Sequence, residues 1–127
     1  MGRFATTVAL YEELRPHYPP AFFRSVAQKL RLGKEHALID LGTGPGLLAL
    51  GFGPYVGRIG VRVNSIAPGE IDTSILSPGT EKIVEQQIPL HRLGTPDEVA
   101  KIIYVLCTET SSYVNGAEIH INGGQHV

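Results

Sequence analysis

Two stretches decide the fold: "LIDLGTGPGLL" at residues 38–48 and "VRVNSIAPGEIDT" at residues 61–73. The first is a near-continuous apolar run that ends in a glycine-rich loop and then turns into a helix. Such a run is typical of a strand that is buried on both faces. The second alternates apolar and more polar residues before a Pro-Gly turn, as a strand with two unlike faces does. We therefore predict strands over residues 36–42 and 58–67.

Helical spacing of apolar residues predicts a helix over residues 20–32, with Pro20 near its start and Gly33 after its end. A second helix is expected over residues 80–88, with Thr80 as its cap. Another short helix should follow the glycine-rich loop. It should be short because three residues oppose its continuation, namely Gly51, Gly53 and Pro54.

The segment "TPDEVAKIIYVLCTE" at residues 95–109 carries the strongest helix signals. Thr95 can cap the helix, Pro96 suits its first position, and Glu98 completes a capping box. The apolar alternation in residues 117–123 then predicts a last strand. Strands that alternate with helices favour a parallel sheet. The fold class is therefore α/β, a small Rossmann-like sandwich of two or three layers with about three parallel strands.

Connections between parallel strands are right-handed in nearly all proteins. With the strands in sequential order, this rule places both crossover helices on the same face of the sheet. A three-stranded sheet would then leave much apolar surface uncovered. We therefore expect self-association into a homodimer or a higher homo-oligomer.

Composition limits the classes of function. The chain of 127 residues suits one compact domain, and its formal net charge of −1 argues against a nucleic acid or an acidic membrane as partner. Its one cysteine, Cys107, excludes an intrachain disulfide and is expected to be a buried small hydrophobe. No apolar run is long enough to span a membrane, so a cytoplasmic location is expected. The histidines lack ligand spacing, and no metal site is expected.

The glycine-rich loop is the first candidate binding site. Gly42, Gly44 and Gly46 follow an apolar strand and precede a helix, so the backbone can approach a nucleotide at the helix N-terminus. The same glycines also permit a tight turn between strand and helix without any ligand. Both interpretations stay open.

"YEELRPHYPPAFFRSVAQKL" followed by "ALIDLGTGPGLLAL" resembles the start of a class I S-adenosylmethionine-dependent methyltransferase, over about residues 4–57. The resemblance implies that the loop holds the methionine end and the ribose of S-adenosylmethionine. The implied contacts are Asp40, Gly42, Gly44 and Gly46. The acid that grips the ribose hydroxyls in that family has no counterpart here, because Glu70 is not a convincing substitute.

Residues 60–124 resemble the C-terminal part of a classical short-chain dehydrogenase/reductase, through "VRVNSIAPGEIDT", "RLGTPDEVAKIIYVLCTE" and "SSYVNGAEIHINGG". The resemblance implies an NAD(P) cofactor whose nicotinamide faces Pro68 and Gly69. It also implies that Ile71 and Thr73 contact the carboxamide. The family's catalytic Tyr-x-x-x-Lys pair is absent from the sequence, and so is its Thr-Gly-x-x-x-Gly-x-Gly loop.

Taken together, the two resemblances predict one chimeric Rossmann-like domain, with a methyltransferase-like segment over residues 1–57 and a dehydrogenase-like segment over residues 58–127. Because each parent site is incomplete, we expect a folded protein without its own enzymatic activity, with no catalytic residues and no bound cofactor. A weak binding module for S-adenosylmethionine or NAD(P) is the alternative, and residual methyltransferase or reductase activity is a further one. The second resemblance implies subunit pairing through residues 96–109 and 117–123.

Overall fold

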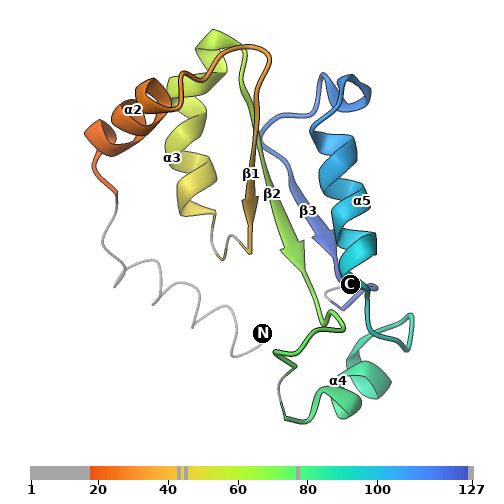
Figure 1. Ribbon diagram of the computed structural model, residues 1–127. Coiled ribbons are helices and arrows are strands. Elements are labelled where there is room, and N and C mark those ends of the chain that lie inside the picture. The colour runs from red at the N-terminus through yellow and green to blue at the C-terminus, as the bar shows by residue number, and fades with distance from the viewer. Residues whose placement is uncertain (1–17, 43, 45, 77, 126–127) are drawn as a thin grey trace.

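A computed structural model describes residues 18–42, 44, 46–76 and 78–125. Its centre is a parallel sheet of three strands in sequential order, β1 (Ala37–Leu41), β2 (Arg62–Pro68) and β3 (Glu118–Ile121) (Figure 1). Ile39 pairs with Asn64, and Ile66 pairs with Ile119. The predicted α/β class and the three parallel strands are confirmed.

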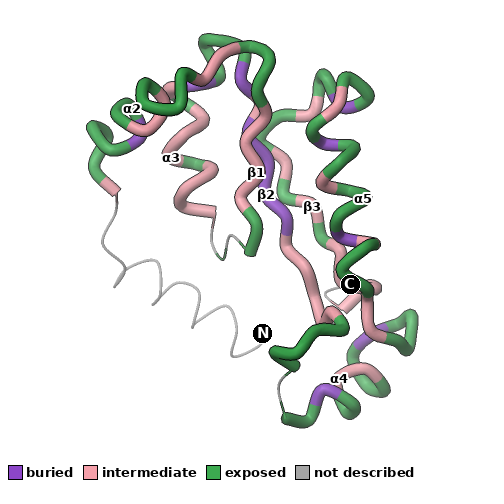
Figure 2. Tube along the Cα trace, viewed as in Figure 1, coloured by how far each residue is buried: buried purple, intermediate pink, exposed green. Residues whose placement is uncertain are grey.

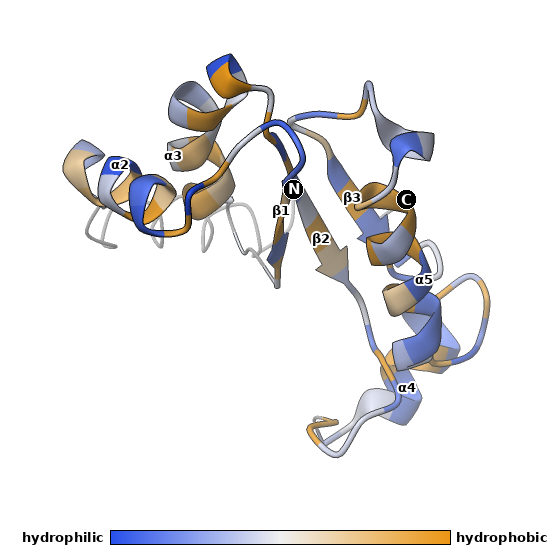
Figure 3. Ribbon diagram, turned by 45° about the horizontal axis from the view of Figure 1, so that its top comes forward, coloured by the Kyte–Doolittle hydropathy of each residue, from blue (hydrophilic) through white to orange (hydrophobic). Residues whose placement is uncertain are grey.

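The described residues also form four helices: α2 (Pro20–Lys29), α3 (Leu47–Val56), α4 (Thr80–Gln87) and α5 (Pro96–Leu106). Two short 3-10 turns, Gly57–Ile59 and Glu109–Ser111, follow α3 and α5. In Figure 3, α3 is coloured mainly hydrophobic and α4 mainly hydrophilic, which fits their places. The helix α3 packs beside the sheet, whereas α4 lies beyond the strand ends (Figure 1).

The two crossover helices cover opposite faces of the sheet. Leu38 packs against the cluster that contains Val56 of α3, whereas the next residue, Ile39, packs against the cluster that contains Val99 and Leu106 of α5. Successive strand residues point to opposite faces, so α3 and α5 lie on different sides. The expectation that both helices share one face is therefore wrong, and the two crossovers have opposite hands. The domain has three layers.

The central strand carries the longest continuous run of buried residues that the structure describes (Figure 2). Residues 63–66 are buried without interruption, with Val63 in the α3 cluster and Ile66 in the α5 cluster. Asn64 is also buried, and its amide donates to Val114 O and accepts from Ala117 N, at 3.0 Å each. This strand therefore joins the two apolar clusters into one fold.

The predicted helix after the glycine loop is confirmed, but the expectation that Gly51, Gly53 and Pro54 end it is wrong. The helix α3 continues through Gly51, Gly53 and Pro54 to the fully buried Val56. At Gly51 a β-carbon would lie 2.0 Å from the ring of Phe23 on α2. The helix is therefore held by tertiary packing, which outweighs the weak helix propensity of these residues.

The predicted start of α5 is confirmed, since Thr95 and Glu98 form a reciprocal capping box and Pro96 is the first residue of the helix. Two other expectations are wrong. Gly79, at a φ of 92°, caps α4, and Thr80 is instead buried and donates to Glu70 at 3.3 Å. Cys107 is exposed, because it lies just past the last buried residue of α5.

Candidate functional site

The carboxyl ends of the three strands meet at one edge of the sheet (Figure 1). The chain that leaves β1 enters α3 on one face, and the chain that leaves β2 runs to α5 on the other face. Neighbouring strands whose connections leave to opposite faces define a switch point, and ligands of open α/β sheets bind there. This edge is therefore the candidate site.

The glycine turn forms one side of the candidate site. Gly42 donates to Ile66 O at 3.1 Å, which ties the turn to the central strand. The φ angles of Gly42, Gly44 and Gly46 are 68°, 57° and 73°, a region that disfavours other residues. A β-carbon on Gly42 or Gly44 would meet no described atom within 4 Å. The positive φ angles thus favour glycine at these positions, and none of the described atoms crowds Gly42 or Gly44.

Asp40 has a structural contact at the start of α3. Its Oδ2 accepts a hydrogen bond from Ala49 N at 3.3 Å, and Ala49 lies in the first turn of the helix. A carboxylate at this place satisfies a free N–H group and interacts favourably with the helix dipole. Asp40, which the methyltransferase resemblance implied as a cofactor contact, therefore supports the turn between β1 and α3.

The segment from Pro68 to Thr73 forms the other side. Gly69 donates to Ile121 O at 3.0 Å. Gly94 donates to Glu70 O at 3.0 Å and accepts from Asp72 N at 2.8 Å. These backbone bonds fix the segment to β3 and to the loop before α5. Its conformation is therefore set by the fold before any ligand arrives.

Two of the predicted contact residues have packing roles in this segment. Ile71 packs into the apolar cluster of α5. A β-carbon on Gly69 would lie 2.7 Å from the β-carbon of Asn122, so this glycine is required by its neighbour. Thr73 is exposed, and its Oγ1 accepts a weak hydrogen bond from Ile75 N at 3.4 Å.

A hollow of about 470 Å³ lies beside this segment, at the end of β3. Its polar lining comes from Glu70, Arg92, Glu98, His120 and Asn122. None of the eight predicted contact residues lines it. Asp40 and Gly46 line two other hollows, of about 150 and 430 Å³. The predicted residues therefore share the carboxyl edge, but none of these three hollows contains both sets.

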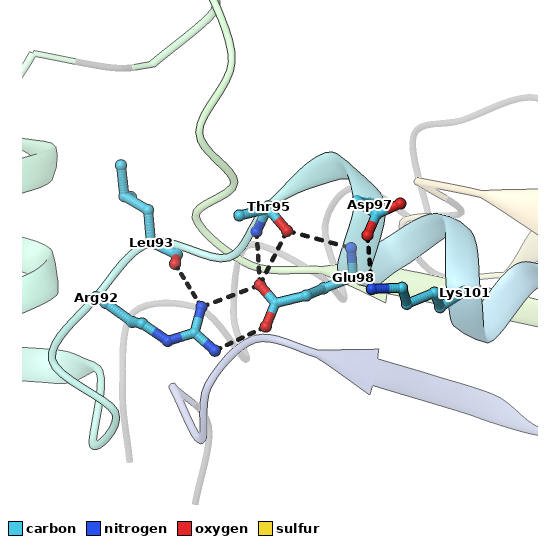
Figure 4. Close-up of polar contacts among 6 residues, drawn as sticks. All are labelled: Arg92, Leu93, Thr95, Asp97, Glu98 and Lys101. Carbon is cyan, nitrogen blue, oxygen red and sulfur yellow. Dashed lines mark hydrogen bonds and ion pairs between the residues drawn. The ribbon is translucent and has the colours of Figure 1, made fainter.

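Arg92 and Glu98, which both line this hollow, form an ion pair, and Figure 4 shows its contacts. The guanidinium of Arg92 donates to both carboxylate oxygens of Glu98, at 2.9 and 2.7 Å. Hydrogen bonds from Arg92 and from the backbone of Thr95 lower the pKa of Glu98 to about 2. Glu98 was predicted as a capping acid, but no pattern in the sequence identified Arg92 as its partner.

Within the described ranges, no three His, Cys, Asp or Glu side chains gather as a metal-binding group. In the same ranges, no helix has the length and apolar character that a membrane span requires. The cytoplasmic location stays a prediction.

The parallel sheet, with helices on both faces and a switch point at its carboxyl edge, defines a Rossmann-like α/β fold. Residues 49–126, more than half of the chain, match the family model described as Enoyl-(Acyl carrier protein) reductase. The chain belongs to this family.

Two curated relatives agree with this assignment. Protein FixR of Bradyrhizobium diazoefficiens is 63% identical over 68 residues, which cover 54% of this chain and 24% of FixR. The 3-oxoacyl-[acyl-carrier-protein] reductase FabG of Aquifex aeolicus is 46% identical over 67 residues, which cover 50% of this chain and 27% of FabG. The chain spans about a quarter of the length of these relatives.

Solved structures of similar proteins also match this chain. A short chain dehydrogenase from Bacillus anthracis matches with a TM-score of 0.62 and 32% identity, over 72% of this chain and 44% of that one. A blue fluorescent protein from a metagenomic library, solved in complex with NADPH, matches with a TM-score of 0.69 over 78% of this chain and 49% of that one. At 19% identity, the second match shows a shared fold alone.

These matches overturn the predicted function. The prediction of a chimeric protein without its own enzymatic activity is wrong, because the family model and the FabG relative are both named as reductases. The family match begins at residue 49, inside the segment assigned to a methyltransferase. The dehydrogenase structure covers a larger share of the chain than residues 58–127 could supply. The resemblance to a short-chain dehydrogenase is confirmed, and the methyltransferase-like half has no support.

Proposed function

We propose that this chain binds the nicotinamide end of an NAD(P) cofactor, as part of a reductase of the short-chain dehydrogenase type. The proposed contacts are Pro68, Gly69, Ile71 and Thr73. The observation that carries the proposal is the position of this segment, at the carboxyl end of the central strand and at the switch point of the sheet. Family membership supports the same cofactor class.

The glycine turn is proposed to approach the pyrophosphate of the same dinucleotide. The residues present fit this group, because Gly42 and Gly44 border open space at the N-terminus of α3. Asp40 and Gly46 would act by holding the turn in shape. This role replaces the contacts with S-adenosylmethionine that the first resemblance implied.

When bound, the nicotinamide supplies the hydride for reduction. The chain's own residues bind and orient that ring. The backbone bonds of Gly69, Glu70 and Asp72 hold the segment rigid, so little ordering is required on binding. Since the sequence contains no Tyr-x-x-x-Lys pair, the proposal assigns no proton donor among these residues.

We also propose that residues 1–127 form one domain that self-associates. The support is that both apolar clusters share the strand β2, while several large side chains stay exposed around the sheet. Exposed apolar surface of this kind favours association between copies.

A titration with NADPH, followed by the fluorescence of the reduced nicotinamide, tests the cofactor proposal. Gly44→Val should weaken binding at least tenfold, because its side chain would fill the open space and strain a positive φ. Gly57→Val is the control, since a β-carbon on Gly57 also meets no described atom within 4 Å, and Gly57 follows the end of α3 that is far from the glycine turn. Equal affinity of all three proteins would refute the proposed site.

A further inference from the structure

Residues 114–117, which we call the β3 entry, lead the chain into β3 and bend at Gly116, where φ is 74°. Two backbone hydrogen bonds tie the β3 entry to the central strand. Gly116 N donates to Val63 O at 2.8 Å, and Ser65 N donates to Ala117 O at 2.8 Å. The chain is therefore aligned on β2 before β3 itself begins.

The side chain of Asn115 adds a bond of the same kind. Its Oδ1 accepts from Val63 N at 2.8 Å. Val63 is only 3% exposed, and a buried N–H group without an acceptor is costly. Asn115 itself is exposed, and this bond uses only the oxygen of its amide. The side chain thus takes the place of a strand carbonyl at the entry to β3.

Asn64 holds the β3 entry from the other face of the sheet. It shares a face with Ile66 of the α5 cluster, because the two residues are two apart on one strand. Its buried amide donates to Val114 O and accepts from Ala117 N, at 3.0 Å each. An asparagine offers a donor and an acceptor together, and this contact uses both. The two asparagines therefore fix the β3 entry from two directions.

The β3 entry sets the register of a very short strand. Strand β3 contains four residues, Glu118–Ile121, and it starts with Glu118 opposite Ser65. A slip by one residue would move its end by about 3.3 Å and turn Ile119 and Ile121 away from the α5 cluster. The β3 entry thus determines which residue arrives at the carboxyl edge, to which β3 runs (Figure 1).

The end of β3 in turn holds the segment that we propose as the nicotinamide contact. Gly69 N donates to Ile121 O at 3.0 Å. The α-carbon of Gly69 also packs closely on Asn122, since a β-carbon there would lie 2.7 Å from the β-carbon of Asn122. In contrast, Gly42 of the glycine turn bonds to Ile66 O on β2. Register errors in β3 should therefore disturb Gly69 and leave Gly42 in place.

We propose that Asn115, together with Asn64, is a positioning residue for the segment from Pro68 to Thr73, and that it acts through the register of β3. The inference rests on the proposed function, because it assigns the orientation of the nicotinamide contacts to these two side chains. Both lie toward the amino end of the sheet, away from those contacts.

Hydrogen exchange, measured by NMR without any ligand, tests the positioning directly. Asn115→Ala removes the acceptor at an exposed position, and we expect the Gly69 amide to exchange about tenfold faster while the Gly42 amide is unchanged. Asn115→Asp keeps an acceptor oxygen and should exchange like the wild-type protein. Equal exchange at Gly69 in Asn115→Ala and the wild type, or equal acceleration at Gly69 and Gly42, would overturn the proposal.

A pair of titrations then tests the consequence for the cofactor. The ligands are NADPH and phospho-ADP-ribose, which is the same dinucleotide without its nicotinamide. Asn115→Ala should raise the dissociation constant of NADPH about tenfold and leave that of phospho-ADP-ribose unchanged. Equal weakening of both ligands would show a merely structural role and would contradict the proposal. If the wild-type protein bound neither ligand, the proposed function would fail, whereas faster exchange at Gly69 alone would still support the positioning by Asn115.

Discussion

Gly69 and Asn122 are packed so closely that no other residue fits at position 69 without movement. A β-carbon on residue 69 would lie 2.7 Å from the β-carbon of Asn122 and 2.8 Å from its α-carbon. The contact joins the ends of β2 and β3, next to the hydrogen bond from Gly69 N to Ile121 O. The end of β3 therefore sets the conformation of the proposed nicotinamide segment.

Gly69→Ala should destabilise the domain by about 1–3 kcal/mol, because the added methyl group forces the ends of two strands apart. Urea unfolding followed by circular dichroism measures the change. Gly57→Ala is the control, since a β-carbon there meets no described atom within 4 Å. An unchanged stability of Gly69→Ala would show that the strand ends adapt freely.

The two central glycines of α3 should respond in opposite directions to alanine. Gly51→Ala pushes a methyl group into the ring of Phe23 and should cost about 1–3 kcal/mol. Gly53→Ala meets open space within a helix and should gain about 0.5–1 kcal/mol. Thermal unfolding of both variants checks the prediction. A loss of stability in both would mean that the packing of α2 on α3 is not the deciding contact.

Arg62 is predicted to hold the end of α5 against the sheet. Its Nη1 donates to Leu106 O at 2.8 Å and its Nη2 donates to Thr108 O at 3.3 Å, so it satisfies carbonyls at the helix C-terminus. Arg62→Met should cost about 2 kcal/mol, since hydrogen bonds from a charged donor are lost in a partly buried place. Chemical unfolding provides the measure. Arg58→Met, at an exposed position, should change little.

Acid should weaken the start of α5 in a defined range of pH. The pKa of Glu98 is lowered from 4.5 to about 2, so the folded state binds a proton less readily than the unfolded state. The stabilisation is therefore complete above about pH 4.5 and is lost as the pH falls through about 2. Glu98→Gln should flatten the dependence of stability on pH in that range. Glu85→Gln on α4 is the control and should leave the pH dependence of stability unchanged. If Glu98→Gln had the same pH dependence of stability as the wild-type protein, the role of the ion pair would be contradicted.

Local patterns predicted the elements well. The strand in the first quoted stretch, the capping box of Thr95 and Glu98, and the alternation of Ile119 and Ile121 all depend on neighbours in sequence. The interactions that form these elements join residues that are close in the sequence, so the sequence alone is enough to predict them. The order of the three strands was left open by the sequence, and the structure supplies it.

Contacts between distant residues decided the features that were mispredicted. Gly51 is explained only by the ring of Phe23, and the opposite hands of the crossovers only by the faces that α3 and α5 cover. The glycine loop suggested the wrong family, because a turn with positive φ values serves many nucleotide-binding folds. No sequence pattern predicts that Asn122 packs against Gly69 or that Arg92 pairs with Glu98.

The most direct test of the proposed function is an amide proton–nitrogen NMR spectrum of the protein, recorded alone and with excess NADPH. Binding as proposed predicts shifts at Gly69–Thr73 together with shifts at Gly42 and Gly44, and much smaller ones with S-adenosylhomocysteine. Shifts confined to Gly42 and Gly44, and equal with both ligands, would contradict a nicotinamide site. A spectrum unchanged by NADPH would contradict cofactor binding by this chain altogether.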